Sequence, residues 1–147
     1  MSERLIAVVA VSSMGLLVGV ALGDTVLSKP QSGVYSLRLA GIREAGASKL
    51  PSCGEEGVRA IESVSRVKVS FDSVKETAIV NGDEWLILKG RSGTFVAKRL
   101  TECTSLTLGL RSQDTKATGI LAYVVRCSER PACTDIADYN GDFSRAP

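Results

Sequence analysis

The residues near the C-terminus that are best suited to chemistry are oxygen donors at alternating positions. The stretch DYNGDF, residues 138–143, places Asp138, Asn140 and Asp142 two residues apart. Oxygen ligands alternate in this way at the start of an EF-hand calcium loop, which needs glycine at its sixth position. Phe143 occupies that position here. The three residues therefore predict no more than a weak, hydrated calcium site. The preferred interpretation is a last strand that docks on the sheet, with a turn or bulge at its Asn-Gly pair.

Carboxylates offer this chain one route to catalysis, as the acid and base of a glycosidase-like hydrolase. The candidates are Glu55, Glu56, Asp83, Glu84, Asp135, Asp138 and Asp142. Adjacent residues on a strand point to opposite faces, so the Asp-Glu doublet is a poor catalytic pair. The chain has no histidine, which excludes Ser-His-Asp and Cys-His nucleophile pairs and histidine acid–base catalysis. We therefore expect a protein that is not an enzyme and has no cofactor, with a carboxylate-based hydrolase as the least favoured alternative.

Four cysteines, Cys53, Cys103, Cys127 and Cys133, predict two disulfides, because an even number in a small exported chain is typical of a disulfide framework. Cys127 and Cys133 bracket a short loop, and the preferred pairing joins them and leaves Cys53 for Cys103. If residues 113–116 form a hairpin in register, Cys103 falls nearly opposite Cys127, and Cys53 then pairs with Cys133. The sequence leaves this choice open. A zinc site of four thiolates is disfavoured because the chain contains no CxxC knuckle.

The N-terminus has the pattern of a secretory signal peptide. Residues 5–23 carry no charge, follow a short basic head and end in small residues before Asp24. We expect cleavage after residue 23 and one secreted or periplasmic β domain over residues 24–147. The alternative is an uncleaved membrane anchor over residues 5–23, because about 20 apolar residues span a bilayer.

Short stretches with a period of two dominate the mature chain and predict half-buried antiparallel strands. They are GVYSLRLA, RVKVSF and SLTLGLR, together with TAIV, EWLIL, TFVAKRL and TGILAYVV. Turn residues separate them at residues 72–73, 81–83, 90–93 and 113–116, and Asn-Gly at 81–82 is a strong hairpin signal. With a closing strand at about 136–143, the pattern predicts an all-β fold. We expect a small antiparallel up-and-down barrel, or a sandwich, of seven or eight strands with one short helical or irregular insertion.

The insertion covers residues 41–63. Residues 55–63 predict one or two helical turns with Val58 and Ile61 facing the sheet. We prefer a plug or cover over one barrel end to a functional lid. WLIL and ILAYVV are apolar on both faces. The apolar outer faces of these two strands indicate either that they are buried beneath the insertion, which we prefer, or that they contact a partner protein.

The first predicted strand opens with Gly33-Val34-Tyr35 and leads into a meander, which resembles the glycine-x-aromatic opening of lipocalin-like barrels. Tyrosine stands where those barrels usually carry tryptophan. The resemblance implies a ligand in the mouth of a barrel, and Tyr35, Trp85 and Tyr123 are the candidate ligand-binding residues.

These observations predict an exported, disulfide-stabilised, non-catalytic binding module for a small apolar ligand or a protein partner. The alternative is a structural or inhibitory envelope protein that acts through an exposed loop, at residues 41–63 or 128–132. The net charge is +2 and the basic residues are scattered, so no nucleic-acid partner is expected. A membrane is expected as a partner only if the N-terminal segment stays uncleaved.

Overall fold

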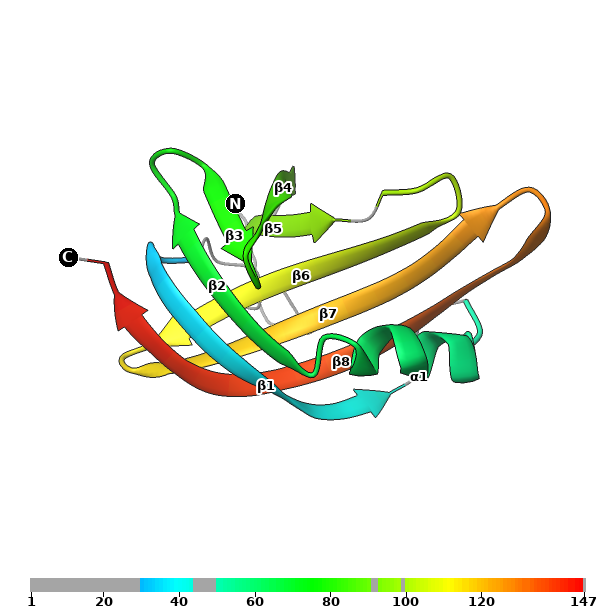
Figure 1. Ribbon diagram of the computed structural model, residues 1–147, viewed down its shortest axis with the longest axis horizontal. Coiled ribbons are helices and arrows are strands. Elements are labelled where there is room, and N and C mark those ends of the chain that lie inside the picture. The colour runs from blue at the N-terminus through cyan, green and yellow to red at the C-terminus, as the bar shows by residue number, and fades with distance from the viewer. Residues whose placement is uncertain (1–29, 44–49, 91–92, 99, 147) are drawn as a thin grey trace, which may run out of the picture.

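A computed structural model describes residues 30–43, 50–90, 93–98 and 100–146. The expected signal peptide, residues 1–23, lies outside this part of the chain. The described elements are β1 (Gly33–Arg43), α1 (Glu55–Glu62), β2 (Arg66–Asp72), β3 (Thr77–Val80), β4 (Asp83–Gly90), β5 (Gly93–Lys98), β6 (Thr104–Gln113), β7 (Lys116–Cys127) and β8 (Arg130–Arg145). Each strand pairs antiparallel with the next, and β8 pairs with β1 to close an eight-stranded up-and-down barrel (Figure 1). The predicted fold class is confirmed as a barrel, and within the described residues no helix is long and apolar enough to cross a membrane.

Tight turns connect β3 to β4 and β6 to β7 where turn residues predicted them, whereas residues 73–76 join β2 to β3. Asn81 and Gly82 both have positive φ, 51° and 90°, as a two-residue hairpin turn between strands requires. Gln113 pairs with Lys116 across the turn from β6 to β7, as expected. The β7–β8 connection is also a two-residue turn, since Cys127 pairs with Arg130. Residues 128–132 therefore form a tight hairpin turn and the start of β8, and residues 128–131 are exposed.

The last strand closes the barrel. β8 pairs with β1 on one side and with β7 on the other, so DYNGDF lies inside a continuous strand. The predicted docking of a last strand is confirmed. The predicted turn or bulge at Asn140 and Gly141 is wrong, because both residues keep their pairing with β1. The irregularity lies instead in β1, between Leu39 and Gly41.

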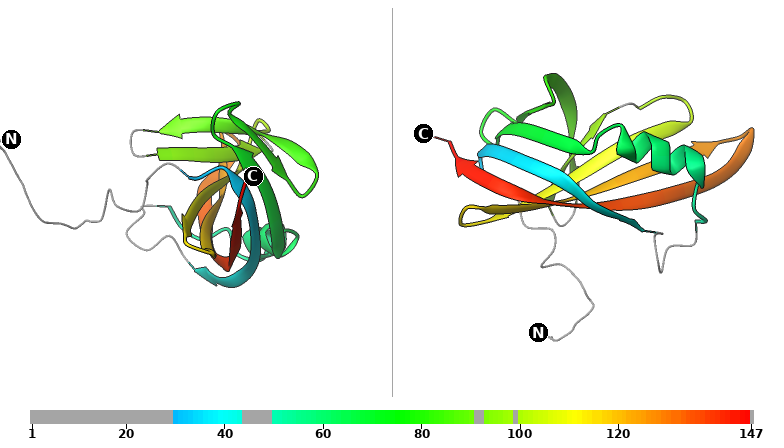
Figure 2. Two further views of the ribbon diagram at one scale, coloured as in Figure 1. Left: turned by 90° about the vertical axis from the view of Figure 1, so that its left-hand side faces the viewer. Right: turned by 60° about the horizontal axis from the view of Figure 1, so that its bottom comes forward.

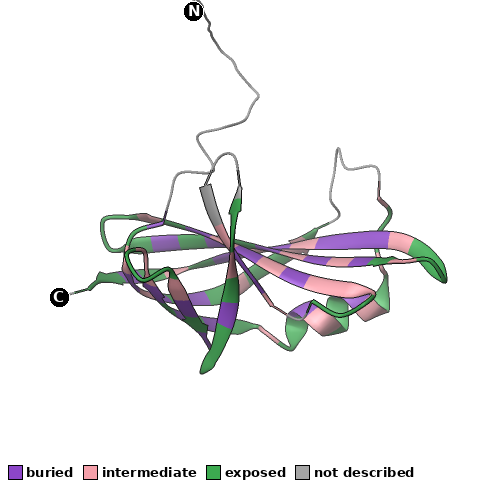
Figure 3. Ribbon diagram, turned by 90° about the horizontal axis from the view of Figure 1, so that it is seen from above, coloured by how far each residue is buried: buried purple, intermediate pink, exposed green. Residues whose placement is uncertain are grey.

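Side chains that point into the barrel form its core. Buried and exposed positions alternate along the strands, as Figure 3 shows, because successive side chains point to opposite faces of a sheet. The largest fully buried side chains are Tyr35, Tyr139, Ile61, Leu106, Leu108 and Leu121. Five of these lie on strands, whereas Ile61 comes from α1 and belongs to the same cluster. The helix therefore contributes to the core as well as covering it.

α1 packs beside β1, β7 and β8, near the end of the barrel at which β1 ends and β8 begins (Figures 1 and 2). This confirms that residues of the insertion cover one end. Ile61 is fully buried as predicted, whereas Val58 is 37% exposed and does not belong to the core cluster. The buried face of the helix consists of Gly57 and Ile61, which are four residues apart and lie one above the other.

The outer faces of the two-sided apolar strands are not covered by the helix as we preferred. Leu86 is 59% exposed and Leu88 is 41% exposed on β4, which is not among the strands that α1 packs against. Ile120 on β7 is 39% exposed. Burial beneath the insertion is therefore wrong for these three side chains.

Candidate functional site

A disulfide fastens the start of the helical cover to β8. Cys53, two residues before α1, is bonded to Cys133, with 5.1 Å between their Cα atoms. The preferred Cys127–Cys133 pairing is wrong. Strand register explains this, because Val125 and not Cys127 lies opposite Cys133. The observed Cys53–Cys133 bond is the pairing expected for the alternative in which residues 113–116 form a hairpin in register.

A buried carboxylate lies below the first turn of α1. Asp135 on β8 is 3% exposed, although it is charged. Its Oδ1 accepts a hydrogen bond from the Ser52 hydroxyl at 2.6 Å, and its Oδ2 accepts one from the Cys53 backbone N–H at 2.9 Å. A negative charge is favourable at a helix N-terminus, where backbone N–H groups lack partners. A Cβ at Gly57 would collide with Oδ2, so glycine at that position allows the carboxylate to approach the helix.

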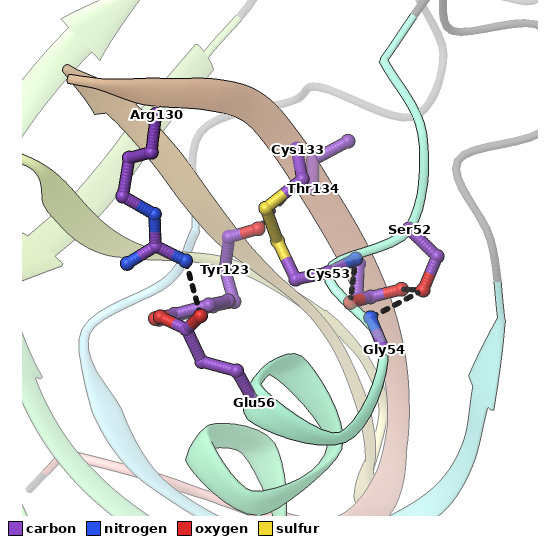
Figure 4. Close-up of a disulfide and its surroundings, with 9 residues drawn as sticks. Ser52, Cys53, Gly54, Glu56, Tyr123, Arg130, Cys133 and Thr134 are labelled. Atoms are coloured by element: carbon purple, nitrogen blue, oxygen red, sulfur yellow. Dashed lines mark hydrogen bonds and ion pairs between the residues drawn. A yellow bond between two sulfur atoms is a disulfide. The ribbon is translucent and has the colours of Figure 1, made fainter. Parts of the chain in front are cut away.

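A second carboxylate on the same turn joins the helix to the barrel wall. Glu56 accepts a hydrogen bond of 2.7 Å from the Tyr123 hydroxyl, and it forms an ion pair with Arg130 (Figure 4). Burial, and then the bond to Glu56, raise the pKa of Tyr123 to about 12. The bond from Arg130, and then that from Tyr123, hold the pKa of Glu56 below its ordinary value of 4.5. Together with the disulfide and the hydrogen bonds to Asp135, these contacts attach the start of α1 to β7 and β8.

The Glu56 contacts predict a pH-dependent stability. Because the pKa of Glu56 is lower in the folded state, its stabilising contribution is fully present above the unfolded pKa. That contribution is lost as the pH falls through the folded pKa. We expect Glu56→Gln to melt at a lower temperature than the wild type at pH 7. The difference should shrink as the pH falls below the ordinary pKa of 4.5 and the carboxylate of the wild type becomes protonated. Melting followed by circular dichroism over this range measures the effect.

Glu55 supplies the matched control for this measurement. Its side chain is 90% exposed, and among the described residues its ion pair is with Arg59 on the same helix, at 3.4 Å. Glu55→Gln should therefore show nearly the pH profile of the wild type. A Glu56→Gln variant whose deficit stays constant over the whole pH range would contradict the assignment.

The candidate ligand-binding aromatic residues all lie in the core. Tyr35, Trp85 and Tyr123 are 0%, 6% and 7% exposed. The Tyr35 hydroxyl donates a hydrogen bond to the carbonyl oxygen of Gln31 at 2.7 Å, and its ring packs on Phe143 with 4.7 Å between centroids. The hydroxyls of Tyr35 and Tyr123 are thus both satisfied by protein groups. Their role as ligand contacts stays a prediction.

The candidate carboxylates do not gather at one place. Asp138 forms an ion pair with Arg43 at 2.7 Å, and Asp142 forms one with Lys116 at 3.6 Å. Asp83 lies on β4 beside Lys98. The weak calcium candidates, Asp138, Asn140 and Asp142, lie on the extended strand β8, so their oxygens are not wrapped by a loop. Among the described residues, no group of three or more Cys, Asp or Glu side chains is placed to hold a metal ion.

The other two cysteines are thiols that lie side by side. Cys103 precedes β6, and its carbonyl oxygen accepts a hydrogen bond from the Arg126 backbone N–H. Cys103 thus faces Arg126, one residue before Cys127. A hydrogen bond between the two thiols is the main cause that raises the pKa of Cys103. Of the two predicted disulfides, the structure therefore has one, and it places the remaining cysteines in contact.

The barrel carries a cluster of positive charge on its outer surface that the sequence did not reveal. Strand register places Arg66, Arg38, Asn140, Thr118 and Arg111 in one row across β2, β1, β8, β7 and β6. It places Lys68, Ser36, Asp142, Lys116 and Gln113 in a second row on the same five strands. All ten residues are exposed. We call these two rows the basic face.

The basic face contains five cations and one carboxylate, whereas the whole chain has a net charge of only +2. Asp142 is paired with Lys116. Among the described residues, the side chains of Arg38, Arg66, Lys68 and Arg111 have no ion pair. A groove of about 440 Å³ runs over this surface, lined by Arg38, Arg66, Lys68 and Asn140 among others. The hydrophilic side of each strand was recognisable from its alternation, but only the register of five strands shows that these cations share a face.

Searches of protein-family models, of curated proteins and of solved structures find no match to this chain.

Proposed function

We propose that the protein is an exported, disulfide-stabilised, non-catalytic binding module that meets its partner on the outer surface of the barrel. The Cys53–Cys133 bond supports export, because disulfides persist mainly in oxidising compartments. The expected signal peptide leads to the same compartment, secreted or periplasmic. Membrane attachment would follow if residues 5–23 stay in place.

The observation that carries this proposal is the side-chain packing inside the barrel. Side chains from all around the wall, together with Ile61 of the cover, belong to one buried cluster. The phenols of Tyr123 and Tyr139 reach the covered end and donate to Glu56 and to the Val64 carbonyl oxygen. Small barrels of eight strands are either filled by their own side chains or hold one small ligand, and this packing favours the filled form.

The proposal changes what the resemblance to lipocalin-like barrels implies. The eight-stranded antiparallel barrel is compatible with that fold. In a lipocalin-like protein the ligand would enter the mouth of the barrel and contact residues such as Tyr35 and Trp85. In our proposal these side chains hold the fold together, and the partner is a macromolecule. The exposed Leu86 and Leu88 favour recognition at the outer wall, since solvent-exposed apolar side chains that gather on one face mark interaction sites.

Native mass spectrometry tests the proposal directly. The full chain would be exported by a bacterial host, purified without detergent, and weighed under native and denaturing conditions. We expect a mature chain that begins at Asp24 and carries no small molecule. An apolar molecule that co-purifies in a one-to-one ratio would overturn the outer-surface proposal and restore the small-ligand form. A Tyr35→Phe variant, which is lighter by one oxygen atom, should likewise carry no small molecule.

A further inference from the structure

We infer that the basic face is a binding site for an acidic polysaccharide, that is, for a linear glycan bearing carboxylate or sulfate groups. The inference deepens the proposed function and rests on it, because it names the class of partner that the outer surface takes. The site consists of cations on neighbouring strands with hydroxyl and amide side chains between them.

The spacing of the cations fits a chain of anions. Arg38 and Arg66 lie directly opposite each other on β1 and β2, and adjacent strands are about 4.8 Å apart. Lys68 stands in the second row, two residues from Arg66 on the same strand face. A carboxylate or sulfate placed between the two guanidinium groups can accept hydrogen bonds from both, and arginine forms such bonds in a bidentate geometry. Further along the first row, Arg111 on β6 offers a second point of attachment.

Two cations of the basic face lie in an electrostatically unfavourable arrangement. Like charges directly opposite each other across two strands repel and destabilise the sheet, and Arg38 and Arg66 are such a pair. Neither side chain has a carboxylate partner within the described part of the chain. A bound anion would remove this repulsion and replace the missing partner. The pair is thus better suited to holding a ligand than to supporting the barrel.

The side chains between the cations favour a hydroxylated polymer over other polyanions. Ser36, Thr118 and Asn140 are exposed within the two rows and can bond sugar hydroxyls. The two rows contain no aromatic residue on which nucleic-acid bases could stack. They also contain no apolar side chain that could enter a lipid interface, as membrane-surface segments require. The basic face therefore offers charge pairing combined with hydrogen bonds to hydroxyl groups, as binding of an acidic polysaccharide requires.

Isothermal titration with a galacturonate oligomer tests the inference, with dextran sulfate as a second acidic glycan and neutral dextran as the blank. We expect binding of both acidic glycans and none of dextran. The double variant Arg38→Gln/Arg66→Gln should bind at least about tenfold more weakly, because it loses two charge-assisted contacts. Binding by the wild type should weaken as salt is raised, since these exposed charges are screened.

A matched variant separates a site from mere net charge. Arg59→Gln/Lys75→Gln removes two exposed cations that lie on α1 and on the β2–β3 turn, away from the basic face. It should keep nearly the affinity of the wild type. Both double variants change exposed side chains, and Arg38→Gln/Arg66→Gln should melt no lower than the wild type because a like-charge contact is removed. Loss of affinity due to unfolding would therefore be visible in the melting curve.

Several outcomes would overturn the inference. These are wild-type affinity in Arg38→Gln/Arg66→Gln, an equal loss in both double variants, and tighter binding to phosphatidylglycerol vesicles or to single-stranded DNA than to the glycans. None of these outcomes contradicts the proposed function. That proposal is tested separately, and it fails if native mass spectrometry finds a small molecule bound inside the barrel. A protein with a filled barrel that does not bind acidic glycans would still fit the proposal of an outer-surface binding module.

Discussion

Replacing Cys53 and Cys133 together by serine is expected to lower the free energy of unfolding by about 2–5 kcal/mol. The bond joins residues separated by 80 positions, and a cross-link that closes so long a loop removes much conformational freedom from the unfolded chain. Urea denaturation without reductant measures the change. The fluorescence of Trp85, which is the single tryptophan and is buried, reports the transition.

The same variant should also loosen the cover of the barrel. The disulfide lies beside the Asp135 contacts with Ser52 and Cys53, so its loss weakens the attachment of α1 from which Ile61 enters the core. A dye that fluoresces on apolar surfaces should therefore bind the variant and not the wild type. The control is Cys103→Ser/Cys127→Ser, which keeps the bond and should lose about 1 kcal/mol or less. An equal loss of stability in the two double variants would show that the disulfide is not what holds the helix in place.

The strands of this barrel were predictable because each one encodes its two faces locally. In RVKVSF the apolar Val67, Val69 and Phe71 alternate with polar residues, and all three are buried in the structure. The turn at Asn81 and Gly82 was equally local, since both positions need positive φ. These strands predicted an all-β fold but left the choice between a barrel and a sandwich open, and the pairing of β8 with β1 shows that the sheet closes into a barrel.

The covered end could be predicted only in outline. Residues 55–63 indicated a helix, but which face it buries depends on the angle at which it meets β8. The helix turns Gly57 toward the barrel because the carboxylate of Asp135 occupies the space that a side chain would need. Val58 is consequently left partly exposed to solvent. This contact joins residues that are far apart in the sequence, and no local pattern marks it.

The basic face could not be predicted from the sequence because it also depends on how distant strands are paired. Arg38, Arg66 and Arg111 each lie on the polar side of an alternating strand, which by itself indicates only a solvated surface. Whether they gather depends on the stagger of five strands, and a slip of one residue between β1 and β2 would separate Arg38 from Arg66. The sequence therefore identified the residues and their exposure, but not their common location.

Gly141, in the middle of DYNGDF, is expected to be among the least replaceable residues of the barrel. Gly141→Ala should lower the free energy of unfolding by about 3 kcal/mol, at the upper end of the range for overpacked sites. A Cβ at this position would collide with the backbone carbonyl oxygen of Ser36 and would lie 2.8 Å from the Cα of Leu37. Both atoms belong to the backbone of β1, so no side-chain movement can relieve the contact. The strands that close the barrel would have to separate, which urea denaturation would detect.

Gly41→Ala is the matched control, because it makes the same chemical change in β1 near the same seam. A Cβ at Gly41 would meet nothing within 4 Å, so this variant should stay within about 0.5 kcal/mol of the wild type. If Gly141→Ala were equally harmless, the close approach of β1 and β8 would not exist in solution. The seam also carries the pairing of Arg38 with Asn140 and of Ser36 with Asp142. Opening it should therefore weaken glycan binding as well as stability, because the two rows of the basic face cross the barrel at this junction.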